Sequence, residues 1–176
     1  SKAPKYDLSI GSIRRRELEL AWKDLQQREV EINLFLQATK QFILGLDEDA
    51  EDRGDKARVH YQQSLADLDN WISTSATSRD PYQFIYPISY QVIRGIILFH
   101  IALNDRLKAV RSRHIPQVKS PGNKVKFLHS AKTHLEESRQ AFETAGRPDL
   151  VAGILCYLGD VLKGLYQWDD LQNLAE

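Results

Sequence analysis

The pattern of apolar and polar residues in the first quarter of the chain has a helical period. Apolar residues recur at steps of three and four residues, at Leu18, Trp22, Leu25, Ile32 and the pair Phe35/Leu36. Such steps place the apolar side chains on one face of a helix. No Pro or Gly interrupts this pattern from Ser12 until Gly45. The pattern therefore predicts a long first helix over about 12–46, followed by a solvated acidic loop over 47–55.

Further helical segments follow, separated by stretches rich in Pro, Gly, Ser and Thr. The pattern predicts helices over about 56–73, 87–113, 123–144 and 149–163, and a sixth helix that begins near Trp168. No stretch of four or more residues shows strand alternation without a better helical interpretation. The chain is therefore expected to be all-α, with no sheet.

Two parts of the chain repeat the same order of residues. "ARVHYQQSLADL" from Ala57 matches "AKTHLEESRQAF" from Ala131, with identities at Ala57/Ala131, His60/His134 and Ser64/Ser138 and an offset of 74. "VIRG" from Val92 matches "VLKG" from Val161 with an offset of 69. Internal repeats of this kind are the mark of helical arrays. They predict that a two-helix unit occurs twice.

The C-terminal stretch "LCYLGDVLKGLYQWDDL" resembles the first helix and turn of a tetratricopeptide repeat. Leu155, Leu158, Gly159 and Leu162 stand at the steps of the family pattern. The resemblance covers about 130–176, and more weakly 57–112. It implies that Gly159 lets a neighbouring helix approach closely.

The second helix of the tetratricopeptide family opens with Ala-x-x-x-aromatic. Ala57 and Tyr61 satisfy this pattern, and Ala131 with Leu135 satisfies it in part. The resemblance implies that each small Ala nests its helix against a neighbour. No such pattern covers 1–55.

These observations together predict an array of antiparallel helix pairs, a tetratricopeptide-like α-solenoid fragment preceded by a long N-terminal helix. Residues 1–176 are read as one all-α domain, a fragment of a larger repeat protein. Its parts are a long helix and acidic loop over 1–55, a divergent helix pair over 56–112, and tetratricopeptide-like helices over 123–176. Because the last helix carries Trp168, Leu171 and Leu174 with no stop signal, we expect this face to meet further repeats or a second copy.

The overall composition excludes few classes of function. Lys plus Arg and Asp plus Glu both number 24 in 176 residues, so net charge points to no class of partner. The most apolar stretch, Val92–Leu103, is too short to span a bilayer and carries Arg94 and His100. We therefore expect a buried core helix there, and no membrane association. The lone cysteine, Cys156, cannot form an internal disulfide; we expect a buried thiol and a cytoplasmic protein.

No catalytic, metal or cofactor site is predicted. The five histidines have no pair at the i, i+4 spacing of metal ligands, the acidic stretch from Asp47 lacks the Gly and terminal acid of a calcium loop, and no phosphate-binding loop is present.

One charge asymmetry remains as a candidate site. No acidic residue occurs from Arg106 to Leu135. The predicted surface for an anionic partner consists of the basic residues of the junction between two helices: Arg106, Lys108, Arg111, Arg113, Lys119, Lys124 and Lys126.

The sequence thus favours a non-enzymatic protein–protein interaction scaffold that binds a protein or peptide, with an acidic peptide suiting the basic stretch. Two alternatives stay open. One is a helical regulatory or sensor segment of a multidomain, nucleotide-driven signalling protein. The other is a nucleic-acid-binding helical domain, which rests on the basic stretch alone.

Overall fold

The computed structural model describes residues 8–75, 86–111 and 121–173; near several helix ends, and over most of α1 before Asn33, it describes the backbone only. Within these ranges the chain forms five helices and no strand, which confirms the all-α prediction. The helices are α1 (Leu8–Ala50), α2 (Gly54–Ser75), α3 (Tyr86–Arg111), α4 (Pro121–Thr144) and α5 (Pro148–Asn173). The first four agree with the predicted helices to within about four residues at each end.

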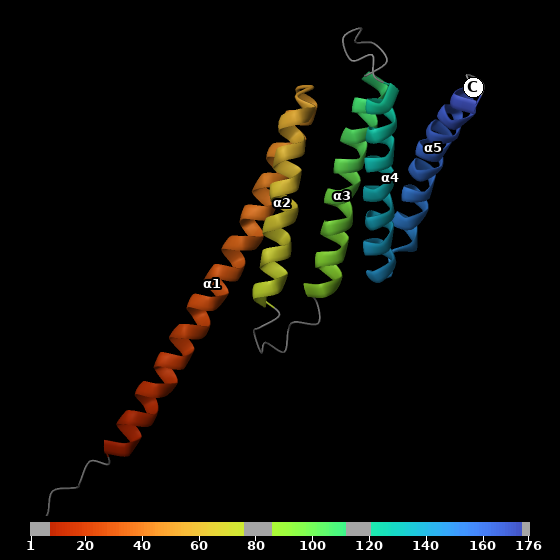
Figure 1. Ribbon diagram of the computed structural model, residues 1–176. Coiled ribbons are helices and arrows are strands. Elements are labelled where there is room, and N and C mark those ends of the chain that lie inside the picture. The colour runs from red at the N-terminus through yellow and green to blue at the C-terminus, as the bar shows by residue number, and fades with distance from the viewer. Residues whose placement is uncertain (1–7, 76–85, 112–120, 174–176) are drawn as a thin grey trace, which may run out of the picture.

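The helices stand side by side in chain order, and each runs antiparallel to the one before (Figure 1). α1 packs mainly on α2 and α4 mainly on α3, with α5 on the other side of α4. α1 is much longer than α2, and its N-terminal half extends beyond the array (Figure 1).

The central helix, α3, serves two apolar clusters at once. Ile97 and Ile101 join the cluster between α1, α2 and α3, while Ala102 and Ala109 join the cluster between α3, α4 and α5. A helix that is covered on two sides must be apolar on two sides. This explains why the most apolar stretch of the sequence lies here, and it confirms the predicted core helix.

The tightest helix contacts occur where a glycine faces an aromatic ring. Gly45 of α1 lies against the ring of Tyr61, and a Cβ at Gly95 of α3 would lie 2.6 Å from Cε1 of Phe142. Both rings are buried. The absence of a side chain at these two glycines therefore sets how closely α1 approaches α2, and α3 approaches α4.

In each of these two close helix pairs, a serine donates a hydrogen bond to the backbone of the preceding helix. Ser64 Oγ of α2 donates a 2.7 Å hydrogen bond to the carbonyl oxygen of Ala38, and Ser138 Oγ of α4 donates a 2.7 Å bond to that of Gly95. Both serines are completely buried. The predicted match between Ser64 and Ser138 is thus a match of environment as well as of sequence.

The other identities of the repeat behave in a similar way. Ala57 and Ala131 are both fully buried, as expected for small residues that nest one helix against another. His60 bonds Gln41 of α1 through Nδ1 at 2.8 Å, and Nδ1 of His134 lies 3.3 Å from Asp105 of α3. Each histidine thus reaches back to the preceding helix.

Two short turns have the same hydrogen-bond pattern. After α4, Gly146 has a φ of 66°, and Arg147 N–H bonds the carbonyl of Phe142. After α1, Asp52 has a φ of 61°, and Arg53 N–H bonds the carbonyl of Glu48. This is the Schellman motif, which satisfies the last carbonyls of a helix and reverses the chain. The predicted acidic loop over 47–55 is therefore mostly helix, because α1 continues to Ala50.

The C-terminal region differs from the prediction. α5 is one continuous helix, so the break after residue 163 and the sixth helix near Trp168 are wrong. Along α5, the residues buried against α4 recur at helical steps: Ile154, Val161 and Leu165. Gly164 continues this contact, since a Cβ added to it would lie 3.3 Å from Cδ1 of Leu128. Because one apolar face runs through the whole stretch, nothing breaks the helix there.

The residues that carried the tetratricopeptide resemblance in α5 do not take the expected places. Gly159 is exposed, and a Cβ added to it would meet nothing within 4 Å. Leu155 is 47% exposed, whereas Leu158 packs against the core. The expected close approach of a helix at Gly159 is therefore wrong; Gly164 makes that approach. The side chains of Trp168, Leu171 and Leu174 lie outside the described part of the chain.

Cys156 is exposed, so the expected burial of this thiol is also wrong. It lies on the side of α5 away from the buried face formed by Ile154 and Val161. Its apolar neighbours in the sequence suggested burial, but neighbours in a helix point in different directions.

The glycine contacts lead to a test of the packing. We expect Gly95→Ala to destabilise the protein by about 1–2 kcal/mol, because the added methyl group must displace the buried ring of Phe142. Gly159→Ala is the matched control: it adds the same methyl group to an exposed helical site and should stabilise by about 0.5–1 kcal/mol through helix propensity. Urea denaturation followed by circular dichroism measures both. Equal effects of the two substitutions would contradict the proposed close contact.

Candidate functional site

The predicted surface for an anionic partner lies at the end of the array where α3 ends and α4 begins. Five of its seven residues are described; Arg113 and Lys119 lie outside the described residues. Of the five, Arg106, Lys108 and Lys124 are half-buried, and Arg111 and Lys126 are exposed.

Acidic residues from other helices and from the turn between α1 and α2 pair with three of these cations. Arg106 Nη2 lies 3.0 Å from Asp160 Oδ2 on α5, and Lys108 Nζ lies 2.6 Å from Asp55 Oδ1 at the start of α2. Arg111 pairs with Asp52 in the turn between α1 and α2. These acids are distant in sequence from α3, but the packing of the helices brings each of them against one of its cations. A stretch without acidic residues in the sequence is therefore not without them in space.

The pairing changes what the surface can attract. Lys108 is held in place twice, by Asp55 and by the ring of Phe127, whose centroid lies 6.0 Å from Nζ. Its hydrogen bond to Asp55 is also the main reason that the pKa of this carboxyl lies below its ordinary value. Lys108 and Arg111 thus serve to connect α3 to the start of α2.

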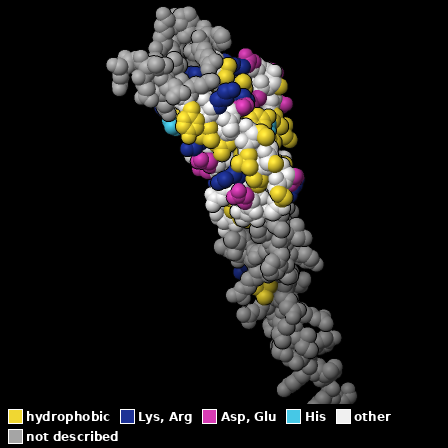
Figure 2. Space-filling view, turned by 90° about the vertical axis from the view of Figure 1, so that its right-hand side faces the viewer, with side chains coloured by type: hydrophobic (Ala, Val, Ile, Leu, Met, Phe, Trp, Pro, Cys, Tyr) yellow, Lys and Arg dark blue, Asp and Glu magenta, His cyan; other side chains and the backbone are white. Residues whose placement is uncertain are grey.

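A basic pocket remains at the other edge of this surface, between α3, α4 and α5. It has a volume of about 220 Å³, and its charged lining consists of Arg106, Lys124, Lys163 and Asp160. Its apolar lining comprises Ala109, Val110, Leu128, Val161 and Gly164. Three cations against one carboxylate leave the pocket with a positive balance beside an apolar wall. Figure 2, which views the molecule from the α5 side, shows basic, acidic and apolar side chains intermingled there.

Sequence reasoning found two of the three cations of this pocket. Arg106 and Lys124 belong to the predicted surface, but Lys163 was missed because Asp160 precedes it and it lies outside the acid-free stretch. Lys163 lies three residues after Asp160, which places both on the same side of α5. This spacing is the only sequence signal that connects Lys163 with the residues of the pocket.

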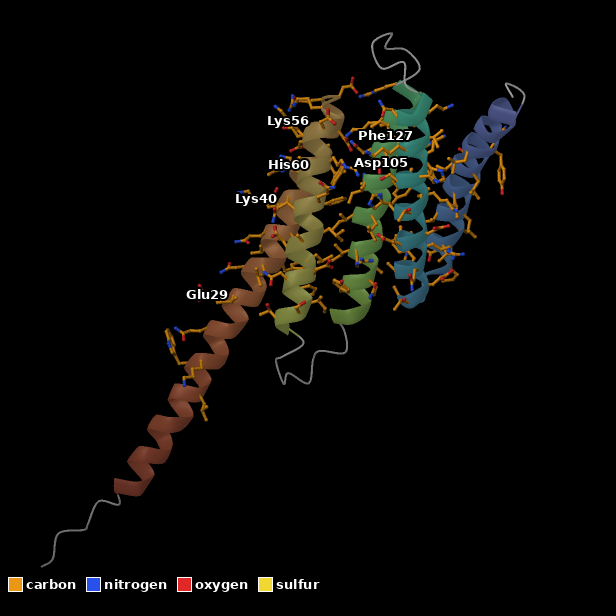
Figure 3. All side chains as sticks on the ribbon, viewed as in Figure 1. Glu29, Lys40, Lys56, His60, Asp105 and Phe127 are labelled. Atoms are coloured by element: carbon orange, nitrogen blue, oxygen red, sulfur yellow. The ribbon has the colours of Figure 1, made fainter. Side chains whose placement is uncertain are left out.

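The most polar part of the core surrounds Asp105 on α3 (labelled in Figure 3). This carboxylate is completely buried. Ser130 Oγ donates a 2.7 Å hydrogen bond to Oδ2, Arg58 of α2 pairs with Oδ1, and His134 Nδ1 lies 3.3 Å from Oδ2. A buried charge needs such partners to offset its lost hydration. Asp105 therefore connects α2, α3 and α4.

A second polar contact fixes the turn between α1 and α2 to α3. Asn104 Nδ2 donates to the carbonyl of Gly54 at 2.7 Å and to Asp49 at 3.3 Å. Tyr61 OH donates to the same Asp49 carboxylate at 2.6 Å. Burial, followed by this hydrogen bond, raises the pKa of Tyr61 well above its ordinary value. The phenol therefore stays protonated and keeps its donor role.

Two histidines lie in surroundings that disfavour a charged ring. His100 is enclosed by the rings of Phe42, Tyr61 and Phe99, whose centroids lie 5.3–5.7 Å away. Burial lowers the pKa of His100 and of His134. At His134, burial is the largest cause; the charge of Glu137 acts in the opposite direction and that of Arg58 in the same direction, so the pKa stays below its ordinary value.

Ser130, His134 and Asp105 are the residue types of a hydrolytic triad, but their hydrogen bonds do not follow the order of a triad. A serine nucleophile must give its proton to an imidazole, whereas Ser130 donates to the carboxylate. Among the described residues, no group of three His, Cys, Asp or Glu side chains is arranged to hold a metal ion. The geometry of this cluster thus suits a structural role.

Comparison with protein-family models, curated protein sequences and solved structures gave no significant match. Within the described ranges, no helix combines the length and apolar character needed to cross a bilayer.

The Asp105 cluster can be tested by a double-mutant cycle. Asp105→Asn should cost about 2 kcal/mol or more of unfolding free energy, because Arg58 loses its countercharge in a partly buried site. The double variant Arg58→Met/Asp105→Leu should lose less unfolding free energy than the two single variants lose in sum, because no unpaired charge remains in it. Chemical denaturation supplies the four free energies, and strict additivity would show that the two residues do not interact.

The lowered histidine pKa values predict a loss of stability as the pH falls through about 6.5. The unfolded chain takes up protons near the ordinary histidine pKa of 6.5, while the folded chain resists until lower pH. Stability should therefore fall as pH falls through 6.5, by up to about 1.4 kcal/mol per pH unit for each histidine. His100→Gln should flatten this slope, because it removes one of the two buried histidines. A slope of the opposite sign would contradict the burial argument.

Proposed function

We propose that this chain is a non-enzymatic protein–protein interaction module, a helical array that binds an acidic peptide segment at one end. The pocket between α3, α4 and α5 carries the proposal. Its cations lie beside an apolar wall, which fits a carboxylate next to an apolar anchor in a partner peptide. Electrostatic attraction of this kind favours an acidic partner and fixes its position.

The tetratricopeptide kinship is a separate proposal with its own support. In its favour are the antiparallel order of the helices and the nesting of Ala57 and Ala131. Against it stand exposed Gly159 and the unbroken α5. We therefore base the function on the array and its pocket rather than on the family. We also propose a cytoplasmic location, because a single cysteine cannot form an internal disulfide.

A binding titration tests the proposed function. The probe is a fluorescein-labelled peptide in which Glu and Asp alternate with Leu, followed by anisotropy at low and moderate salt. The triple substitution Arg106→Gln, Lys124→Gln and Lys163→Gln should weaken binding about tenfold and reduce its salt dependence, because each surface contact contributes about 0.2–1 kcal/mol. The matched control removes three lysines elsewhere, by Lys40→Gln, Lys56→Gln and Lys132→Gln, and should leave the affinity unchanged.

The other outcomes distinguish the alternatives. Tighter binding of duplex DNA than of the peptide, with a steep salt slope, would favour a nucleic-acid-binding domain. Equal loss of affinity in both triple variants would show non-specific attraction and would overturn the proposed pocket. A regulatory segment predicts instead that binding at the pocket changes the exchange of amide hydrogens across the array.

A further inference from the structure

The pocket between α3, α4 and α5 contains an acidic residue of its own. Asp160 of α5 belongs to the lining, and its Oδ2 accepts a 3.0 Å hydrogen bond from Nη2 of Arg106 on α3. The side chain of Arg106 is 39% exposed and that of Asp160 60% exposed. The ion pair is therefore open to solvent, and a partner segment that enters the pocket can reach it.

This ion pair can be replaced at little cost. Pairs between exposed side chains contribute little to stability, because water solvates and screens both charges. The contact also uses a single N–H group of Arg106, whereas an arginine can present two parallel N–H groups to one carboxylate. A carboxylate that arrives on a partner and makes both hydrogen bonds forms the stronger contact. Asp160 is thus displaced by a group of its own chemistry.

Arg106 keeps its position in the pocket without Asp160. Its Cζ lies over the ring of Tyr157, 5.9 Å from the centroid, which is within the range of a cation–π contact. The ring of Tyr157 is itself held, because it packs edge-on against the ring of Phe99 at a centroid distance of 4.9 Å and against the buried cluster of α3, α4 and α5. The guanidinium group therefore has a second support that does not occupy its hydrogen-bond donors.

The charge of Asp160 also opposes the attraction of an anion to the pocket. The charged residues of the lining are Arg106, Lys124, Lys163 and Asp160. Asp160 stands three residues before Lys163, so the two are neighbours on the surface of α5. A negative charge in this place repels the anion that the three cations attract.

We propose that Asp160 is an internal competitor for Arg106. In the free protein it occupies this arginine, and the carboxylate of an acidic partner segment displaces it on binding. This inference rests on the proposed function of the pocket and adds to it a residue that limits the affinity. A carboxylate that binds at Arg106 alone gains about what Asp160 loses there. The partner is therefore a segment with neighbouring acidic residues, which contacts Arg106 and the lysines of the pocket together.

Removal of the competing charge tests this inference. Asp160→Asn keeps the size of the side chain and should tighten binding of the fluorescein-labelled acidic peptide about threefold or more, because Arg106 is released and one repulsive charge is gone. The matched control, Glu136→Gln, removes one charge from the exposed Lys132–Glu136 pair of α4 and should leave the affinity unchanged. Circular dichroism should show that both variants keep the helical fold.

The displacement itself can be observed by nuclear magnetic resonance. Addition of the acidic peptide to the ¹³C-labelled wild-type protein should shift the side-chain carboxyl carbon of Asp160, because this group loses its arginine. The carboxyl carbon of Asp149, whose pair with Arg147 lies outside the pocket, should not shift. An unchanged Asp160 signal at saturating peptide would show that the ion pair survives binding and would overturn the inference.

The outcomes separate this inference from the proposed function. Loss of binding in the triple variant of the pocket cations supports the function whatever the effect of Asp160→Asn. Weaker binding by Asp160→Asn would then show that Asp160 positions Arg106 for the partner, and unchanged binding would show no competition; either result overturns the inference. Equal tightening in Glu136→Gln would also overturn it, by showing a general effect of net charge. If neither the wild-type protein nor Asp160→Asn binds the peptide, the proposed function fails and this inference fails with it.

Discussion

The close approach of helices at glycine positions is the constraint on which the rest of this fold depends. Gly95 accepts the ring of Phe142, and Gly45 accepts that of Tyr61. Because the backbones come close at these points, Ser138 and Ser64 can reach a carbonyl oxygen of the preceding helix. Removal of either glycine would separate the helices and lengthen these hydrogen bonds. The two tight pairs, α1 with α2 and α3 with α4, then hold the buried polar residues at the positions where they find partners.

Polar contacts join these two pairs into one array. Asp105 and Asn104 of α3 reach Arg58 and Gly54 of α2, so the middle of the molecule is held by charges and amides as well as by apolar packing. Such contacts are costly unless every group is matched, and they therefore fix one register of α2 against α3. The ion pairs of Lys108 and Arg111 continue this connection at the surface.

The sequence predicted the helices because their apolar periods are local. It also predicted that Ala57 and Ala131 nest against a neighbouring helix, and both are buried. It matched Ser64 with Ser138 as an identity of the repeat, and the structure adds that the two share an environment. It could not predict the partners of Arg106 and Lys108, because Asp160 and Asp55 come from other helices and reach them only in the folded array. The break expected in α5 rested on a family pattern, whereas the continuous apolar face of Ile154, Val161 and Leu165 decides the structure. The apolar period of α1 predicted the helix, but Trp22 and Leu36 of that period are exposed, because the buried positions Ala38 and Gly45 lie on the other side of the helix.

The two edges of the array have different character. α1 exposes Trp22, Leu36 and Ile43 on one side, while α3, α4 and α5 form a basic pocket near the other. We propose that the array binds an acidic segment at the second of these edges. The most direct measurement of the binding claim is the change of backbone amide chemical shifts in the ¹⁵N-labelled protein on addition of the acidic peptide. We predict changes concentrated around Arg106, Lys124 and Lys163, with α2 unaffected; changes confined to α1 and α2, or none at saturating peptide, would contradict it.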